Sequence, residues 1–169
     1  SAHEAGAKKV VVLEQLGYLG GSTNVSEGAL NAVDPARHGK QGIEDSTAKF
    51  YEQTLKGGHD KGDPELVKYL TENSLSSVEW LEAHGVKFKD ELGTATGALW
   101  QRSHYPATPS GNTYIRALEA VIDKTNGAIE VITDAEVNDL IKAEGRIAGV
   151  KAKHFGEKLT VSSLSLIHI

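Results

Sequence analysis

The feature that most constrains the fold is a run of apolar residues near the start of the chain. Residues 8–13 end in three valines and a leucine, and such a β-branched apolar run is typical of a strand buried on both faces in a parallel sheet. Residues 1–6 precede it and have the pattern of the last turns of a helix closed by glycine. A helix, a short turn and a buried strand together indicate part of a βαβ unit.

The rest of the chain mixes predicted helices with short predicted strands. Residues 15–42 are rich in Gly, Ser and Asn without a sustained period, and a connection this long is usually functional. Helices are predicted over residues 43–56, 63–70, 78–84 and 112–126, and residues 86–111 are predicted to be loop with short strands. Strands are predicted over residues 129–133, 136–143, 146–155 and 158–163, with turns at Glu144-Gly145 and Gly156-Glu157. The predicted fold class is therefore α/β, with an antiparallel strand group near the C-terminus.

Local signals mark where several of these helices begin. Asp45 or Ser46 can cap the first of them, and Asp63 followed by Pro64 is a strong start signal for the second. Asn112 can cap the helix over 112–126. Spacing predicts that one helix face is buried by Leu66, Val67 and Leu70, and another by Tyr114, Ile115, Leu118, Val121 and Ile122.

Composition and charge exclude several functions. The formal net charge is −5 with lysines and acids interspersed, so no nucleic-acid partner is predicted. The absence of cysteine excludes disulfides, thiolate zinc sites and thiol catalysis. The 7 histidines are scattered without i, i+4 pairs, so no metal site is predicted. The apolar runs are far shorter than the ~20 residues of a membrane-spanning helix, so no membrane-spanning segment is predicted.

The candidate functional residues begin at the end of the first predicted strand. A carboxylate at the carboxyl end of such a strand can accept hydrogen bonds from two ribose hydroxyls, and Glu14 has this position; the alternative is a solvated strand-end carboxylate. The glycines and hydroxyls of residues 20–28 could approach a pyrophosphate or flavin, or could form a flexible surface loop. Arg102 and His104 could form a binding-site wall or anchor a loop.

Two stretches resemble a known family. LEQLGYLGGSTNVSEGALNA, residues 13–32, and KGGHDKGDPELVKYLTENSLSSVEWLEAHGVKF, residues 56–88, are similar to the fumarate reductase and succinate dehydrogenase flavoproteins. The likeness is greatest to the flavocytochrome c fumarate reductase and urocanate reductase branch and covers residues 2–163. It implies FAD as cofactor. Residues 1–163 would be a partial FAD-binding, Rossmann-like domain of the glutathione-reductase type, an internal fragment lacking the first strand and Gly-rich turn.

The resemblance also implies roles for individual residues. Glu14 would hold the adenosine ribose, and the backbone of Val137 would meet the adenine. The pyrophosphate and flavin side would be lined by Ser22, Thr23, Glu27 and Gly28. No catalytic residue is implied within the chain, because the family's catalytic arginine and substrate-binding residues are expected downstream.

Three positions depart from the family pattern. Ser22 stands where many members have Asn, Glu27 where small residues are usual, and Ala29 where the second glycine of a Gly pair is usual. These departures bear on how the chain would contact the flavin.

The implied activity is reduction or formation of the double bond of a small unsaturated carboxylate by hydride transfer at the flavin. Fumarate is the first expected substrate and urocanate the second; 3-ketosteroid dehydrogenase, aspartate oxidase and a non-enzymatic α/β interaction module are the alternatives. An electron-donor domain or protein carrying haem or flavin is expected outside the fragment. Because the phosphate-binding turn is expected elsewhere, the fragment alone is expected to be inactive and not to retain FAD.

The last residues form a separate expectation. Residues 164–169, LSLIHI, follow a predicted strand without a turn or cap. They resemble the translation of CTGTCTCTTATACACATC, an adapter used in transposase-based DNA library preparation. We therefore interpret them as sequencing read-through and set them aside from the domain at 1–163; a natural apolar tail is the alternative.

Overall fold

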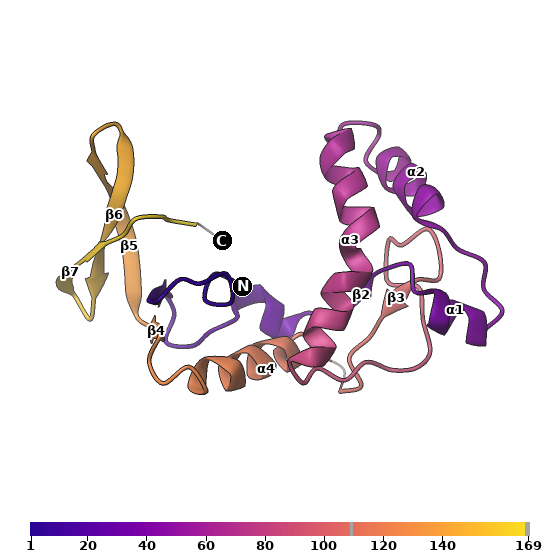
Figure 1. The fold of residues 1–169 in the computed structure, drawn as a ribbon, viewed down its shortest axis with the longest axis horizontal. Helices are drawn as coiled ribbons and strands as arrows, with labels where there is room; N and C mark the ends of the chain where they lie inside the picture. The colour runs from indigo at the N-terminus through magenta and orange to yellow at the C-terminus, as the bar shows by residue number, and fades with distance from the viewer. Residues whose placement is uncertain (109, 168–169) are drawn as a thin grey trace. The chain divides into compact units, whose positions relative to one another are not determined.

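A computed structural model describes residues 1–108 and 110–167, and the chain divides into two compact units. The first unit comprises residues 1–21 and the segment from Glu119 onward, and the second comprises Ser22–Leu118. Figure 1 traces the elements of both units along the chain. Each unit is described by itself below.

The first unit contains a parallel strand pair. β1 (Val10–Leu13) lies beside β4 (Ile129–Ile132) in parallel register. All four residues of β1 are partly exposed, so the strand is present but the prediction that it is buried on both faces is wrong. The physical reason is that β4 is the strand that pairs with β1 within the described residues, and a strand with one neighbour is not enclosed.

The glycine-closed turn before β1 is confirmed. Gly6 has φ +98°, its amide donates to the His3 carbonyl (3.0 Å), and the Ala7 amide donates to the Ala2 carbonyl (3.1 Å). This pair of bonds is the Schellman motif that ends helices in a left-handed residue.

The first unit also contains the predicted antiparallel strand group. Its strands are β5 (Ala135–Ala143), β6 (Arg146–His154) and β7 (Glu157–Ser162), in the order β5-β6-β7. The first turn is at Glu144-Gly145, as predicted, with positive φ at both residues. The second is at Phe155-Gly156, one residue earlier than predicted, because these are the two residues with positive φ.

The second unit combines short helices and a two-residue strand pair. Its elements are η1 (Gly21–Val25), β2 (Leu30–Asn31), α1 (Pro35–Lys40), α2 (Thr47–Gly57), α3 (Pro64–Ala83) and β3 (Ser103–His104), followed by the start of α4 (Asn112–Asp123). The structure corrects the prediction of an irregular connection over 15–42, which holds three of these elements. Asp34 accepts from the Arg37 amide, and Pro35 is the first residue of α1. This start signal was missed because the helix has only 6 residues and so no sustained period.

α3 shows both a correct and a wrong prediction. Asp63 caps it as expected, but one helix of 20 residues replaces the two helices predicted. The expected buried stripe is wrong, since Leu66 is 69% and Leu70 55% exposed. The residues of α3 that are buried instead are Thr71, Ser74 and Val78. Contact with the core in the second half of the helix sets its inward face.

The other helix starts are close to those predicted. Ser46 caps α2 by accepting from the Lys49 amide, and Phe50 is buried. Asn112 lies inside α4, and the Ser110 hydroxyl accepts from the Asn112 amide (3.0 Å) in the capping role expected of Asn112.

The core of the second unit joins its helices to the loop after α3. It consists of the buried residues Ala32, Val78, Val86 and Phe88, with Leu30, Leu75, Leu81, Tyr114 and Ala117 packed against them. Tyr114 therefore ties the start of α4 into this core. None of the helices within the described residues is long and apolar enough to cross a membrane.

Candidate functional site

Glu14 lies directly at the carboxyl end of β1, where strand pairing fixes its backbone. Its amide donates to the Ile132 carbonyl (2.9 Å), and its carbonyl accepts from the Ala135 amide (2.8 Å). Its carboxylate accepts from the Leu16 amide through Oε1 (2.7 Å). A carboxylate offers about four lone-pair sites, so this bond orients the group and leaves acceptor capacity for two hydroxyls.

Val137 belongs to the same unit as Glu14 and lies near it. The bond from Ala135 to Glu14 places the start of β5 beside the end of β1. Val137 follows two residues later, about 7 Å along an extended strand, and is 44% exposed. The structure therefore brings together the two residues expected to meet the ribose and the adenine.

The segment after Glu14 is folded closely over the junction of β4 and β5. The Asp134 amide donates to the Leu16 carbonyl (3.1 Å), and a Cβ built on Gly17 would lie 3.4 Å from the Asp134 carboxylate. Asp134 itself has φ +52°. This packing makes a tight corner at the carboxyl end of the parallel pair.

The other four predicted cofactor residues lie in the second unit, within residues 21–28. Ser22 and Thr23 are exposed on η1, and Glu27 is exposed after it. Gly28 is buried with φ +74°, and a Cβ on it would meet the Gly111 amide nitrogen at 3.0 Å. Because both the conformation and the space exclude a side chain, the glycine at this position is required by the fold.

The 21–28 segment is fastened to the start of α4. The Gly111 amide donates to the Ser26 carbonyl (2.9 Å), and the Ser110 hydroxyl donates to the Asn24 carbonyl (3.1 Å). The Asn112 side-chain amide donates to the Asn24 side-chain oxygen (2.8 Å). The Tyr114 hydroxyl donates to the Gly28 carbonyl. The segment is thus a fixed structure and not the flexible surface loop that the sequence left open.

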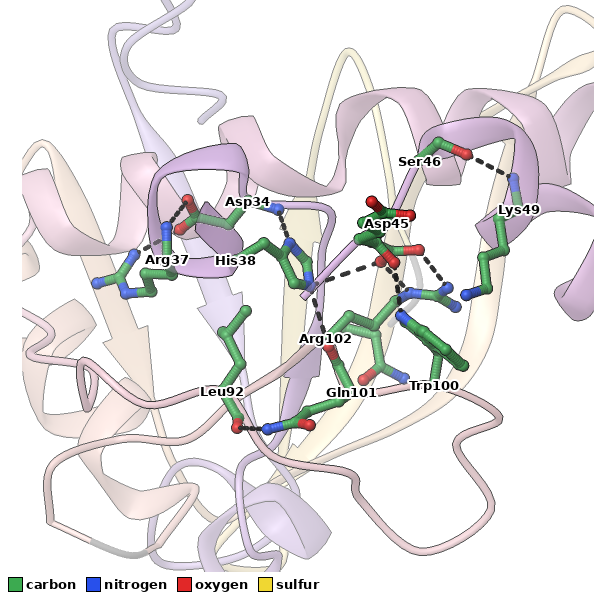
Figure 2. Close-up of polar contacts among 12 residues, drawn as sticks. Asp34, Arg37, His38, Asp45, Ser46, Lys49, Leu92, Trp100, Gln101 and Arg102 are labelled. Carbon is green, nitrogen blue, oxygen red and sulfur yellow. Dashed lines mark hydrogen bonds and ion pairs between the residues drawn. The ribbon is translucent and has the colours of Figure 1, made fainter. Parts of the chain in front are cut away.

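A buried polar cluster, which was not predicted, holds the second unit together. It comprises Asp34, Arg37, His38, Asp45, Arg102 and His104. Figure 2 shows Arg102 facing Asp45, with two hydrogen bonds of 2.7 and 2.8 Å between them. The Arg102 guanidinium also lies over the Phe50 ring, 4.5 Å from its centroid.

The histidines of this cluster bridge segments far apart in sequence. His38 Nδ1 accepts from the Asp34 amide (3.2 Å), so Nε2 carries the proton and donates to the Gln101 carbonyl (2.9 Å). His104 Nε2 lies 3.3 Å from Asp34 Oδ2. Arg102 and His104 are both buried and paired, which supports the loop-anchoring interpretation over a binding-site wall. The Asp34-Pro35 start signal is the one sequence clue to this cluster.

The cluster makes the stability of the chain depend on pH. Burial raises the pKa of Asp34, but hydrogen bonds from Arg37 and His104 and the charge of Arg37 outweigh burial, so the pKa falls from 3.8 to about 2. Burial lowers the pKa of His104 below 6.5; the Asp34 hydrogen bond opposes this, and the charge of Arg37 adds to it. In both cases the unfolded chain binds the proton first as pH falls.

We therefore expect the free energy of unfolding to fall in two stages on acidification. The first stage begins as pH drops below 6.5, the unfolded value of His104. The second, worth about 2 kcal/mol, lies between about pH 4 and pH 2 and is due to Asp34. Urea unfolding at a series of pH values checks this, followed by the fluorescence of Trp80 and Trp100. Asp34→Asn should abolish the second stage, and an unchanged second stage in that variant would contradict the assignment.

The described residues contain no group of three or more His, Asp and Glu side chains that could hold a metal ion. The acidic and imidazole groups of the cluster are instead occupied by Arg102, Arg37 and backbone groups.

Known proteins similar to this chain are flavoproteins and reductases. The family model described as an FAD binding domain matches residues 1–166. NADH:fumarate oxidoreductase of Klebsiella pneumoniae is 33% identical over 152 residues, which cover 89% of this chain and 16% of that protein. Urocanate reductase of Eggerthella lenta is 32% identical over 166 residues, which cover 90% of this chain and 25% of that protein. A solved structure, the open conformation of a flavocytochrome c3 fumarate reductase, matches with a TM-score of 0.80 and 25% identity, over 95% of this chain and 33% of that one.

The chain belongs to the FAD-binding domain family, and fumarate reductases are among its relatives. The predicted family and its cofactor, FAD, are confirmed by these matches. The mixed α/β class and the antiparallel strand group are confirmed as well. The chain spans less than a third of the length of the curated relatives it matches.

Proposed function

We propose that the protein carrying this chain is an FAD-dependent reductase of a small unsaturated carboxylate, with fumarate the first substrate and urocanate the second. The observation that carries the proposal is the Glu14 carboxylate at the carboxyl end of β1, oriented by the Leu16 amide in a chain of the FAD-binding domain family. The names of the relatives, which include fumarate and urocanate reductases, support the choice of substrates.

The residues present fit the cofactor. Glu14 would hold the adenosine ribose, and the backbone of Val137 would meet the adenine. Ser22, Thr23 and Gly28 would line the pyrophosphate and flavin side, where the close approach of Gly111 leaves Gly28 without room for a Cβ. Glu27 is exposed beside them and belongs to the same proposed surface.

FAD supplies the hydride chemistry when bound, and the role of this chain is to hold and orient it. The exposed hydroxyls of Ser22 and Thr23 can donate to phosphate oxygens, and the segment that carries them is fixed by α4. Glu14 contributes acceptors where the ribose presents donors.

The finer features of the fold are part of the proposal. We infer that β1 and β4 belong to the parallel sheet of a Rossmann-like FAD-binding domain of the glutathione-reductase type, and that residues 1–163 are a part of that domain. The Gly-rich turn, the catalytic groups and an electron-donor domain or protein with haem or flavin would be supplied from outside these residues. The parallel register of β1 and β4 supports this.

Assays on the complete protein that carries this chain test the activity. A reduced dye would donate electrons, and its oxidation would be followed with fumarate, urocanate and acrylate as separate acceptors; a 3-ketosteroid would be tested as an electron donor to the oxidised dye. We expect oxidation with fumarate, or failing that with urocanate. Activity with the steroid alone, or a protein that binds no flavin, would contradict the proposal and favour the dehydrogenase or the interaction module.

The residues after 163 are proposed to lie outside the domain. Leu164 is 89% and Ile167 76% exposed, which is the opposite of what apolar residues of a packed domain show. Resequencing the source DNA with adapters trimmed tests the read-through interpretation of 164–169. A continuous gene that encodes the same six residues would contradict it.

A further inference from the structure

The start of α4 makes an unusually complete set of contacts with the 21–28 segment. Side chains of Ser110, Asn112 and Tyr114 each donate to this segment, at the Asn24 carbonyl, the Asn24 side chain and the Gly28 carbonyl. The separations in sequence are 86, 88 and 86 residues, so these bonds form by tertiary folding and not by local turn geometry.

Steric fit reinforces these hydrogen bonds. A Cβ built on Gly111 would lie 2.0 Å from the Thr23 carbonyl oxygen and 2.3 Å from the Ser26 hydroxyl. A Cβ built on Gly28 would lie 3.1 Å from the Tyr114 ring. The two backbones are therefore as close as glycine permits, and small displacements of one are felt by the other.

Tyr114 has the central place in this arrangement. Its ring packs against the core of the second unit, 6.1 Å from the Phe88 ring between centroids. Burial raises the pKa of its hydroxyl to about 12, so the group stays protonated and keeps donating to Gly28 at neutral pH. One end of the side chain is thus fixed in the core, and the other holds a backbone carbonyl of the segment.

We propose that Tyr114, with Asn112, is a positioning residue for FAD: it holds the 21–28 segment in the conformation that presents Ser22, Thr23 and Gly28 to the pyrophosphate and flavin. The inference rests on the proposed function. Neither Tyr114 nor Asn112 needs to touch the cofactor, because each acts through the segment. When the segment is released, it must become ordered as FAD binds, and this ordering lowers the affinity.

Two substitutions in the complete protein test this role. Tyr114→Phe keeps the ring in the core and removes the hydroxyl, and Asn112→Ala removes the bond to Asn24. We expect each to weaken FAD binding about fivefold to tenfold, the factor that corresponds to a lost hydrogen bond of ordinary strength. The fold-loss of FAD affinity in the double variant should be smaller than the product of the two single losses, because both changes release the same segment. Binding is measured by titrating apoprotein with FAD and following the quenching of flavin fluorescence.

FMN separates an effect on the flavin and phosphate side of the site from an effect on the adenosine side. FMN keeps the flavin and one phosphate but lacks the adenosine, so its affinity should fall by the same factor in Tyr114→Phe. Tyr69→Phe is the matched control, since Tyr69 is exposed on α3, and it should leave both affinities unchanged. Thermal unfolding of each variant confirms that the compared proteins are folded, and Asn112→Ala carries the test if Tyr114→Phe unfolds.

The outcomes are distinct. If the unaltered protein binds flavin and both variants bind it equally well, Tyr114 and Asn112 have a structural role only and the inference is overturned. Full additivity of the two changes would also overturn it, because independent effects are not effects on one segment. If the unaltered protein binds neither FAD nor FMN, the proposed function fails and this inference fails with it.

Discussion

Arg102→Ala is expected to lower the free energy of unfolding by about 3–5 kcal/mol, the cost of removing one partner of a buried ion pair. The Asp45 side chain is fully buried and the Arg102 side chain is 3% exposed, so solvent does not replace the lost guanidinium. The two side-chain hydrogen bonds of Arg102 both go to Asp45, and the variant leaves that carboxylate without them. The contact of the guanidinium with the Phe50 ring is lost as well.

Urea unfolding followed by tryptophan fluorescence measures this effect, because Trp80 and Trp100 both lie in the second unit. Arg116→Ala is the matched control: Arg116 is exposed on α4, and its removal should change stability by less than about 0.5 kcal/mol. Equal stabilities of the two variants would show that the buried pair does not hold the second unit together.

Gly111→Ala is expected to weaken FAD binding roughly 5- to 150-fold, as overpacking costs of about 1–3 kcal/mol imply. The added methyl group would lie 2.0 Å from the Thr23 carbonyl oxygen, a distance that real Cβ atoms do not reach. The closest of the neighbouring atoms belongs to the backbone, so the clash is relieved by moving the 21–28 segment away from the start of α4. Equilibrium titration of the apoprotein with FAD measures the loss.

Gly39→Ala is the control for the glycine substitution. A Cβ on Gly39 would have nothing within 4 Å, and the residue lies in α1, where alanine is the better helix former. Its FAD affinity should equal that of the unaltered protein. If Gly111→Ala also binds FAD with unchanged affinity, the contact between the start of α4 and the 21–28 segment does not set the conformation of that segment.

The sequence predicted those parts of the fold that local signals encode. Asp63 followed by Pro64 marked the start of α3, and the glycine-containing turns marked the antiparallel strands. The buried stripe of α3 was predicted wrongly, because Leu66 and Leu70 satisfy helical spacing while the core contacts the helix elsewhere. Periodicity identifies an apolar face but not which neighbour covers it.

The buried cluster could not be predicted, because its pairs join residues far apart in sequence. Asp45 and Arg102 are 57 residues apart, and Asp34 and His104 are 70 apart. In the sequence Asp45 is an ordinary candidate cap, and Arg102 and His104 are candidates for a binding-site wall or a loop anchor. Their pairing is a property of the packed second unit and has no periodic signal.

The candidate site was predicted to a different extent in its two parts. Glu14 followed from the position of a carboxylate at a strand end, and the structure shows how the Leu16 amide orients it. The 21–28 segment was recognised by its glycines and its family resemblance, but its contacts with the start of α4 were not predicted. Asn112 was predicted to cap a helix, and Tyr114 was predicted to lie on the buried face of that helix. Neither prediction includes their hydrogen bonds to Asn24 and Gly28.

The most direct test of the central claim compares FAD with FMN in a Glu14→Gln variant of the complete protein, with exposed Glu136→Gln as the control. FMN lacks the adenosine ribose that Glu14 is proposed to hold. Hydrogen bonds to a charged group contribute about 1.5–3 kcal/mol, so FAD should bind roughly 10- to 150-fold more weakly to Glu14→Gln while FMN binds as before. Equal loss of both flavins, or no loss of FAD, would contradict the assignment of Glu14 to the ribose.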